Sequence, residues 1–198
     1  MATEREVKLE LACPEYERLL QHLESRVVEQ QENQFFDTAG GLLLNNGWAL
    51  RLRSSGEHHW VTLKGPSTIR DGIHERPEFE ARITRTAAEQ VKHHPSQMLT
   101  AITCPRSIRE RLTDQTLVCV GGFSNERRHV DVDGVHLELD RTRFPGNVYR
   151  YELELELSEH ANEEQATLER ILKRLSIPMR FSEKSKYQWL LTYLGKAS

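Results

Sequence analysis

The sequence predicts a single α+β domain, composed mainly of antiparallel β-sheet, in which the sheet closes into a barrel and helices pack on its outside. Three observations predict this fold. Charged and apolar residues alternate along several segments, Asn-Gly and Asp-Gly pairs separate such segments, and apolar residues recur at helical spacing in others. The 198 residues suit one barrel domain over residues 1–198, because no repeat and no linker-like composition interrupts them.

The N-terminal part is expected to form a strand and then a helix. Along residues 4–11, Glu4, Glu6 and Lys8 occupy one face and mainly apolar residues occupy the other, as in a strand with one charged face. Apolar residues recur at helical spacing over residues 15–26, and Pro14 suits a helix start. This second segment is predicted to be an amphipathic helix.

Strand patterns continue to residue 157. Further strands are predicted at residues 32–37, 48–53, 59–64, 73–83, 117–123, 126–132, 135–140 and 148–157. Turn signals such as Asn46-Gly47 and Asp133-Gly134 lie between them, so a meander is the expected topology. Short helices are predicted at 86–94 and 105–112, and further helices at 159–175 and 183–194.

Composition restricts the partners and the compartment. Lys and Arg number 27 against 30 Asp and Glu, a balance that argues against nonspecific binding to nucleic acid. Cys13, Cys104 and Cys119 show neither paired spacing nor a zinc-finger pattern, so a reducing cytoplasm is expected. No apolar run approaches the roughly 20 residues that cross a bilayer, so no membrane span is expected, and no oligomeric state is indicated.

The same arrangement of charge recurs in six strand segments. The charged faces carry Glu4, Glu6 and Lys8; Arg51 and Arg53; Thr62 and Lys64; Glu78, Glu80 and Arg82; His136, Glu138 and Asp140; and Glu152, Glu154 and Glu156. One such face alone is normally the solvent side of an antiparallel sheet. Here charge is segregated by strand, with a basic cluster on adjoining strands and rows of carboxylates on others.

Closure of these strands would create a charged tunnel. The apolar faces would then point outward and need cover, which the helices predicted at 15–26 and 159–175 can supply. Guanidinium groups bind phosphate oxygens in bidentate fashion, and carboxylates hold Mg²⁺ or Mn²⁺, which neutralise charge during phosphoryl transfer. The pattern therefore favours a phosphorylated small molecule as the ligand.

Several motifs resemble those of the CYTH superfamily of triphosphate tunnel metalloenzymes. The N-terminal run Glu4-Arg5-Glu6-Val7-Lys8 has the family's form E-x-E-x-K, which alone is a common pattern. Further motifs follow in the family's order: Phe36-Asp37-Thr38, Leu50-Arg51-Leu52-Arg53, Thr62-Leu63-Lys64, residues 72–80, Glu138-Leu139-Asp140, residues 152–156 and Ser185-Lys186. The set is most similar to the catalytic domain of bacterial inorganic triphosphatases. The histidine-rich helical domain that often follows in those proteins is not expected here.

The resemblance implies a fold, a cofactor and roles for individual residues. It implies a closed eight-stranded β-barrel, the triphosphate tunnel, that holds Mg²⁺ or Mn²⁺. The metal ligands, directly or through water, would be Glu4, Glu6, Asp140, Glu154 and Glu156. The phosphates would be held by Lys8, Arg51, Arg53, Lys64, Arg127 and Lys186. The expected catalytic residues are Glu6, Lys8, Arg53 and Lys64.

Some assignments stay open at this point. Arg127 and Arg128 compete for one inward position, and Lys184 competes with Lys186, which fits the family's ending better. The remaining polar residues on the charged faces have alternative roles. Glu78 and Glu80 are interior acids that either serve the site or pair with Arg82. Glu152 is a third possible carboxylate or a rim residue. For His136, which faces the same way as Asp140, hydrogen bonding is expected in preference to metal binding.

The resemblance implies a metal-dependent triphosphatase that converts inorganic triphosphate to diphosphate and phosphate. Water would attack a terminal phosphorus, because the sequence carries neither a phosphate-binding glycine loop nor a nucleophilic serine or cysteine motif. Hydrolysis of a thiamine or nucleoside triphosphate is an alternative. Two further alternatives are a class IV type of adenylate cyclase and a non-catalytic module that binds polyphosphate.

Overall fold

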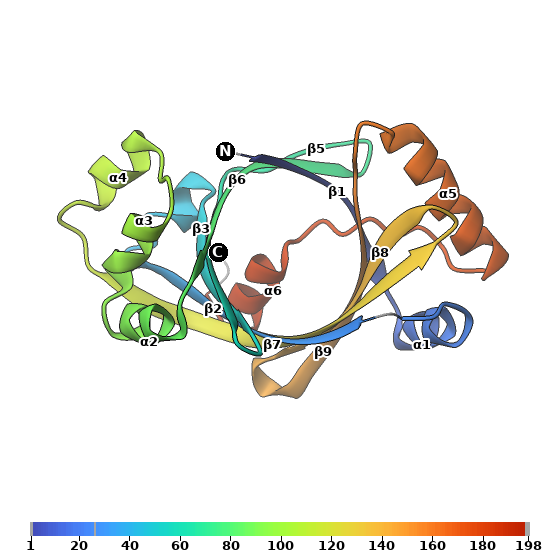
Figure 1. Cartoon of the computed structure of the whole chain (residues 1–198), viewed down its shortest axis with the longest axis horizontal. Coiled ribbons are helices and arrows are strands. Elements are labelled where there is room, and N and C mark those ends of the chain that lie inside the picture. The colour runs from blue at the N-terminus through green and yellow to red at the C-terminus, as the bar shows by residue number, and fades with distance from the viewer. Residues whose placement is uncertain (1, 26, 197–198) are drawn as a thin grey trace.

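The chain forms one antiparallel sheet, eight strands of which close into a barrel (Figure 1). The structure is a computed structural model and describes residues 2–25 and 27–196. The strands are β1 (Ala2–Leu11), β2 (Val27–Thr38), β3 (Ala49–Ser55), β4 (His58–Lys64), β5 (Thr68–Arg70), β6 (Ile73–Ile83), β7 (Leu117–Val132), β8 (Val135–Phe144) and β9 (Val148–Glu156). The barrel order is β1-β9-β8-β7-β2-β3-β4-β6, and pairing of β1 with β6 closes it. The predicted closed eight-stranded barrel is confirmed.

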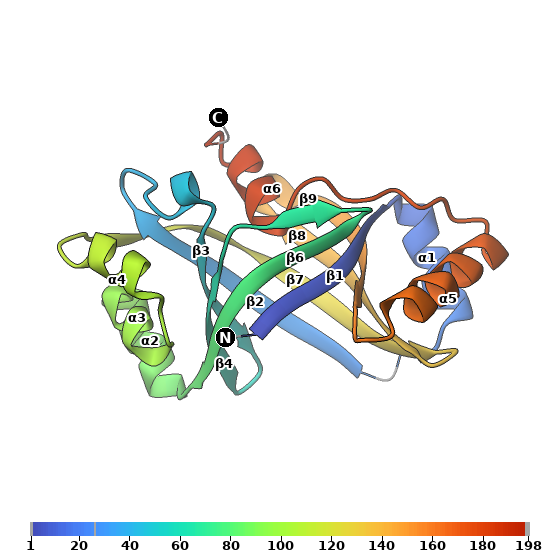
Figure 2. The same ribbon diagram turned by 90° about the horizontal axis from the view of Figure 1, so that it is seen from above.

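Helices lie outside the barrel on two sides and near one opening (Figures 1 and 2). The helices are α1 (Cys13–His22), α2 (Arg85–His93), α3 (Met98–Ala101), α4 (Arg106–Leu112), α5 (Ala161–Arg174) and α6 (Lys186–Tyr193), with short 3₁₀ turns at Leu44–Asn46, Pro95–Gln97 and Pro145–Asn147. Helices α2 to α4 lie together on one side, and α1 and α5 lie on the other. In Figure 1, α6 is seen through the barrel, across its far opening.

The apolar faces of the strands point out of the barrel, as the charge pattern predicts. One apolar cluster joins Leu9 of β1 and Leu153 of β9 to Leu19 of α1 and Leu168 of α5. A second cluster packs β3, β4 and β6 against α2, α3 and α4. These leucines are fully buried, so the helices supply the apolar cover that an inverted barrel needs. The polar faces are left to line the interior.

The register of β1 brings its charged residues next to those of β9 and β6. Glu6 lies opposite Glu156, and Lys8 lies opposite Glu154. On its other side, β1 is paired antiparallel with β6, where Glu6 lies opposite His74. Strand β1 therefore places its charged residues between those of β9 and β6.

The expected meander is correct for two parts of the sheet and wrong for the rest. Strands β2, β3, β4 and β6 are neighbours in order, and so are β7, β8 and β9. However, β1 lies between β6 and β9, and β2 pairs with β7. Helical connections cause this difference: α1 joins β1 to β2, and α2 to α4 join β6 to β7, so neither link forces its strands to be adjacent.

Several strand boundaries differ from the sequence prediction, and β8 continues four residues past its predicted end to Phe144. The strands predicted at 117–123 and 126–132 are one continuous strand, because Asn125 lies inside the barrel and its amide donates to Asp140 Oδ1 at 2.9 Å. The short edge strand β5 was not predicted, and β2 begins five residues earlier than expected. The predicted end of the first helix, Arg26, lies outside the described residues.

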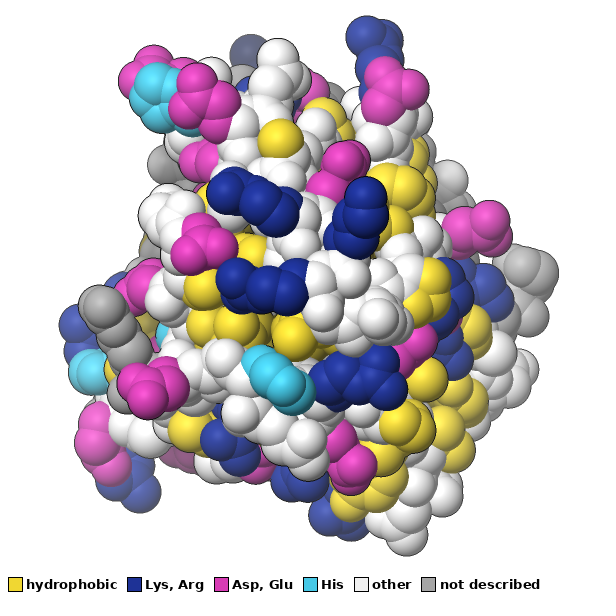
Figure 3. All heavy atoms as spheres, turned by 90° about the vertical axis from the view of Figure 1, so that its right-hand side faces the viewer, with side chains coloured by type: hydrophobic (Ala, Val, Ile, Leu, Met, Phe, Trp, Pro, Cys, Tyr) yellow, Lys and Arg dark blue, Asp and Glu magenta, His cyan; other side chains and the backbone are white. Residues whose placement is uncertain are grey.

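The outer surface mixes residue types. On the side covered by α1 and α5, basic, acidic and apolar side chains are interspersed (Figure 3). Within the described residues, no helix is both long enough and apolar enough to cross a membrane. The three cysteines are free, Cys104 buried and the other two exposed.

Candidate functional site

The interior of the barrel is a charged cavity of about 650 Å³. Alternation along each strand directs every second side chain inward, so polar residues from opposite walls face one another. The acids that line the cavity are Glu4, Glu6, Glu78, Glu80, Glu138, Glu154 and Glu156. The bases are Lys8, Arg51, Arg53, Lys64, Arg76, Arg127 and Lys186. Among the described lining residues these seven acids match seven bases, and Asp140 and Glu152 lie buried behind them, so the protein brings no excess of positive charge to the cavity.

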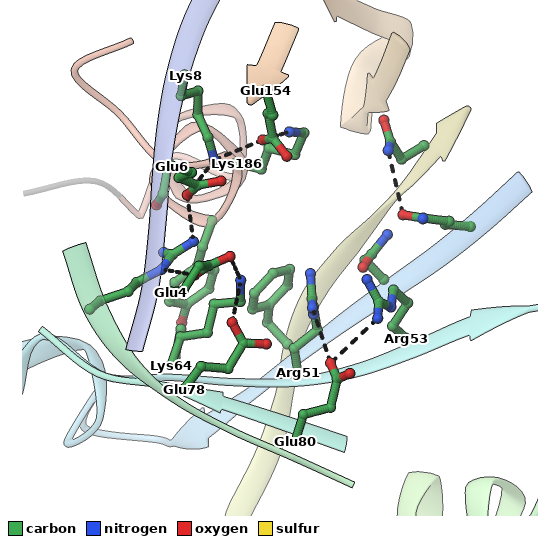
Figure 4. Close-up of a pocket in the computed structure, with 18 of the residues that line it drawn as sticks. Glu4, Glu6, Lys8, Arg51, Arg53, Lys64, Glu78, Glu80, Glu154 and Lys186 are labelled. Carbon is green, nitrogen blue, oxygen red and sulfur yellow. Dashed lines mark hydrogen bonds and ion pairs between the residues drawn. The ribbon is translucent and has the colours of Figure 1, made fainter. Parts of the chain in front are cut away.

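The wall formed by β1 and β9 holds a buried lysine between two carboxylates (Figure 4). Lys8 Nζ lies 3.3 Å from Glu6 Oε1 and 2.8 Å from Glu154 Oε1. Burial alone would lower the pKa of Lys8, but the charges of Glu154 and Glu6 raise it. Lys8 is therefore a fixed positive charge within a set of carboxylates.

Glu4 joins this wall to the adjoining strands β6 and β4. Lys64 Nζ donates to Glu4 Oε1 at 2.7 Å, and Arg76 Nε donates to Glu4 Oε2 at 2.6 Å. Arg76 also donates to Glu6 Oε1 at 3.1 Å. Burial opposes ionisation of Glu4, but the charges of Lys64 and Arg76 outweigh it and lower the pKa of this carboxyl. Glu4 is thus a carboxylate at neutral pH.

The basic cluster on β3 and β4 has donors with no partner. Arg51 and Arg53 both lie near Glu80 Oε2, at 4.0 and 3.4 Å. Each of the two arginines nevertheless has a buried Nε atom without a hydrogen-bond partner among the described residues. Burial, and then repulsion by Arg53, lower the pKa of Arg51 to about 10. Because an unpaired buried donor is costly, this pair favours an incoming anion.

A third group joins β7, β8, β9 and α6. Arg127 binds Asp140 in bidentate fashion, Nε to Oδ1 at 2.8 Å and Nη2 to Oδ2 at 2.7 Å, and it also donates to Glu154 Oε2 at 2.6 Å. Lys186 Nζ lies 2.8 Å from Asp140 Oδ2 and 2.6 Å from Glu152 Oε2 and Glu154 Oε1. Burial would raise the pKa of Asp140, but Arg127 and Lys186 lower it to about 2. The two cations are held in place by these carboxylates.

Helix α6 positions Lys186 because its first turn is capped. Ser185 precedes the helix, and its side chain accepts a hydrogen bond from Gln188 N, while Gln188 Oε1 accepts one from Ser185 N at 2.7 Å. Such a capping box fixes the entry of the chain into the helix. Tyr187, on the same turn, stacks on Phe35 at the aromatic end of the cavity, with ring centroids 4.5 Å apart.

The structure places most predicted site residues on one cavity and decides between the open positions. Arg127 lines the cavity, whereas Arg128 bonds to Glu126. Lys186 points into the cavity, whereas Lys184 lies over the ring of Trp189. The predicted residues that line the cavity are Glu4, Glu6, Lys8, Arg51, Arg53, Lys64, Arg127, Glu154, Glu156 and Lys186.

The remaining candidates lie at its edges or behind its wall. Asp140 and Glu152 are buried and contact Lys186, whereas Glu156 lines the cavity and is exposed. Of the two alternatives for Glu78 and Glu80, the described contacts do not include a pairing with Arg82. Glu78 contacts Lys64 at 3.0 Å, Glu80 contacts the arginines of β3, and Arg82 contacts His58 outside the cavity.

Sequence reasoning missed two charged residues of the cavity. Arg76 has the same parity as Glu78 along β6, so alternation alone would have placed it inside, but Pro77 interrupts the pattern. Glu138 was placed on a charged face and received no role. Burial raises the pKa of Glu138 to about 7, although Arg127 opposes this shift. A cation near this carboxyl would favour its ionised form.

The donor set of the cavity suits a hard divalent cation beside an anion. Glu4, Glu6 and Glu156 lie on adjoining strands with Glu154, so several carboxylate oxygens face the cavity from one wall. Oxygen ligands of this kind bind Mg²⁺ and Mn²⁺. Unpaired guanidinium donors lie across the cavity. The arrangement can therefore bind a polyanion together with cations that balance its charge.

Comparisons with known proteins agree with this geometry. The family model described as CYTH domain matches residues 2–188. The structure is similar to HpAC1 from Hippeastrum, with 30% identity, a TM-score of 0.82, and coverage of 98% of this chain and 97% of that one. HpAC1 is described as a candidate adenylyl cyclase with a dominant triphosphatase activity.

Two more distant structures share the fold. A candidate adenylate cyclase from Bacillus halodurans is 22% identical, with a TM-score of 0.72 and coverage of 96% and 98% of the two chains. The PH1819 protein from Pyrococcus horikoshii is 21% identical, with a TM-score of 0.65 and the same coverage. A search of curated proteins finds no significant match. Because the family model spans nearly the whole barrel, the chain belongs to the CYTH family.

Proposed function

We propose that this protein hydrolyses a triphosphate in a metal-dependent reaction, with inorganic triphosphate as the substrate and diphosphate and phosphate as the products. The observation that carries the proposal is the pair Arg51 and Arg53, which lines the same cavity as a wall of carboxylates and whose buried Nε donors have no hydrogen-bond partner among the described residues. Anion donors and cation ligands in one enclosed space suit a phosphate chain with bound metal.

The charge balance of the cavity supports a metal-bound substrate. Seven acids and seven bases line it, so a triphosphate would add several uncompensated negative charges. Cations that enter with the substrate would neutralise this charge. The carboxylate wall favours Mg²⁺ or Mn²⁺ over softer ions.

Each group of side chains has a proposed role. Glu4, Glu6, Asp140, Glu154 and Glu156 would hold the metal, directly or through water. Lys8, Arg51, Arg53, Lys64, Arg127 and Lys186 would hold phosphate oxygens, and Arg76 would keep Glu4 and Glu6 ionised and in place. When bound, the metal supplies Lewis-acid polarisation of phosphate oxygens and orients water.

The proposed reaction breaks one phosphoanhydride bond. Glu6 would accept a hydrogen bond from the attacking water, whose oxygen forms a bond to the terminal phosphorus while diphosphate leaves. Lys8, Arg53 and Lys64 would stabilise the charge that builds on the leaving and transferred oxygens. The dominant triphosphatase activity described for HpAC1, a relative of 30% identity over almost the full chain, supports hydrolysis over other reactions.

One observation favours a nucleotide as a second candidate substrate. Phe35, Phe123 and Tyr187 line one end of the cavity, and Phe35 and Tyr187 are stacked. Aromatic rings of this kind can accept a nucleobase by stacking. In that case ATP would be hydrolysed, or cyclised through attack of its ribose 3′-hydroxyl on the α-phosphorus with loss of diphosphate.

A substrate panel tests the proposal. Inorganic triphosphate, ATP, GTP and thiamine triphosphate are each incubated with purified protein and Mg²⁺ or Mn²⁺, and both phosphate and nucleotide products are quantified. We expect the fastest phosphate release from inorganic triphosphate and none without metal. If cyclic AMP is the main product from ATP, the protein is a cyclase and the proposal is wrong. If substrates bind without turnover, the protein is a polyphosphate-binding module and the proposal is also wrong.

A further inference from the structure

A cluster of four polar side chains lies near the end of the β7–β8 hairpin, beyond the residues assigned to the triphosphate. His129 and Asp131 on β7 have the same parity as Arg127, and His136 and Glu138 lie on β8. The register places His129 directly opposite Glu138 and Asp131 directly opposite His136. Since Arg127 and Glu138 line the cavity, this cluster extends the inner face of the barrel toward the hairpin end.

The two imidazoles face each other through their nitrogens. His129 Nδ1 lies 3.1 Å from His136 Nε2, and the rings are stacked with an interplanar angle of 26°. Two zinc-bound nitrogens in tetrahedral geometry are separated by roughly 3.3 Å, given bond lengths of about 2.0–2.1 Å. The spacing of the two nitrogens is therefore close to that of a shared metal ion.

A carboxylate lies beside the far nitrogen of each ring. His136 Nδ1 lies 2.6 Å from Asp131 Oδ1, which favours a proton on Nδ1 and a lone pair on Nε2. His129 Nε2 lies 3.6 Å from Glu29 Oε1 on the neighbouring strand β2. Carboxylates placed in this way orient metal-binding histidines in known sites.

One nitrogen of this pair has no hydrogen-bond partner among the described residues. If His129 donates from Nδ1 to His136, its Nε2 atom has a lone pair, and that atom is buried without a hydrogen-bond partner in residues 2–25 and 27–196. A cation at Nδ1 would instead place the proton on Nε2, facing the carboxylate of Glu29.

We propose that His129, His136 and Glu138 form a second metal site, for a borderline divalent ion such as Zn²⁺. Glu138 Oε1 lies 3.8 Å from His129 Nδ1, and the three ligand atoms lie within 4.8 Å of one another. Imidazole nitrogens prefer Zn²⁺ and its neighbours, whereas the carboxylate wall deeper in the cavity suits Mg²⁺. The two sites therefore differ in the metal they select.

Occupation of this site would also affect the phosphate site. Glu138 forms an ion pair with Arg127, a residue that also holds Asp140 and Glu154. A metal ion that bound Glu138 would weaken this ion pair and leave one arm of Arg127 available to a phosphate oxygen. The site is thus placed to couple zinc binding to Arg127.

The proposal is tested by measuring zinc affinity in competition with a chromophoric chelator. Mg²⁺ is present in large excess so that it occupies the carboxylate wall. We expect the wild-type protein to bind one Zn²⁺ ion under these conditions. The Asp131→Asn variant is expected to bind it about 10–100-fold more weakly, because the oriented tautomer of His136 is lost, and His136→Asn at least as weakly. His160→Asn, at an exposed histidine elsewhere, is the matched control and should bind as the wild type does.

A second readout does not depend on the variants folding. In wild-type protein, Zn²⁺ should shift the imidazole ¹⁵N resonances of His129 Nδ1 and His136 Nε2 before those of other histidines. Three results would each overturn the proposal. The wild type binds no zinc in excess Mg²⁺, a folded His136→Asn variant binds zinc as tightly as the wild type, or the resonance shifts are confined to other histidines. Mg²⁺-dependent hydrolysis is measured separately, so loss of this site would not be confused with loss of the proposed activity.

Discussion

Individual side chains in the cavity are held by opposite charges before any ligand arrives. Lys8 lies between Glu6 and Glu154, and Glu4 lies between Lys64 and Arg76. A phosphate oxygen must therefore compete with a carboxylate for most of these cations. Arg51 and Arg53 differ, because each keeps a buried donor that has no partner in the described part of the chain. They are the side chains whose binding to phosphate costs the fewest existing contacts.

Replacement of Arg53 tests this view of the basic cluster. Arg53→Ala should lower kcat/KM for triphosphate by about 10²-fold, because it removes charge-assisted hydrogen bonds in a site that partly excludes water. Arg53→Lys should recover only part of the loss, since an ammonium lacks the planar fork. Steady-state phosphate release measures both effects. Arg82→Ala, at an exposed arginine outside the cavity, is the control, and an equal loss there would refute the assignment.

Much of the site could be predicted from the parity of residues along strands. Once Glu6 and Lys8 are placed inside, alternation and the family motif bring Arg51, Arg53 and Glu154 inside as well. Alternation could not choose between Arg127 and Arg128, because that choice depends on the unbroken course of β7 through Asn125. Arg76 was missed for a local reason, since Pro77 obscures a strand that continues through it.

At the scale of elements, α6 shows how a helix outside the sheet completes the site. Its first residue, Lys186, contacts Asp140, Glu152 and Glu154, which come from two different strands. The capping box of Ser185 holds this first turn in place. The position of the Lys186 ammonium group therefore depends on the start of α6 as well as on its ion pairs.

Loss of the cap should weaken substrate binding. Ser185→Ala is expected to cost about 0.5–2 kcal/mol of stability, because Gln188 N loses its acceptor, and to raise KM for triphosphate more than it lowers kcat. Thermal unfolding and steady-state kinetics measure the two effects. Thr192→Ala removes a hydroxyl from the last turn of the same helix and should leave KM unchanged. Unchanged KM in Ser185→Ala would show that the cap does not position Lys186.

The order of strands was harder to predict than the strands themselves. Short turns such as Asp133-Gly134 identify neighbours directly, and the hairpin of β7 and β8 follows from one. The pairs β1–β6, β1–β9 and β2–β7 join segments far apart in the sequence, and no local pattern specifies them. The segregation of charge by strand favoured a closed sheet, and the family resemblance implied the number of strands, but neither gave the strand order.

For the whole molecule, barrel closure places the apolar core outside and the charges inside. Two apolar clusters lie between the outer face of the sheet and the helices, and the interior is held by ion pairs. Stability should therefore respond to pH through the interior carboxylates. Arg127 and Lys186 lower the pKa of Asp140 to about 2, although burial opposes them.

The sign of this effect follows from the direction of the shift. Since the pKa of Asp140 is lower in the folded state than its ordinary value of 3.8, the stabilisation is complete above about pH 4 and is lost as pH falls toward 2. Asp140→Asn should lower the free energy of unfolding at neutral pH, because Arg127 and Lys186 lose a partner, and should flatten the acid dependence. Denaturant unfolding at several pH values measures both. Asp114→Asn, at an exposed position, should keep the wild-type dependence, and an equally steep acid loss in Asp140→Asn would contradict the account.

The central claim is that the carboxylate wall of the barrel makes triphosphate hydrolysis depend on a divalent metal. The most direct test measures phosphate release from inorganic triphosphate across a Mg²⁺ titration, with the wild type and Glu6→Gln side by side. Glutamine keeps the size of the side chain and removes its charge. We expect saturable, Mg²⁺-dependent release by the wild type and a loss of at least about 10²-fold in Glu6→Gln at every Mg²⁺ concentration, with an unchanged fold. Release that needs no metal, or equal release by both proteins, would contradict the claim.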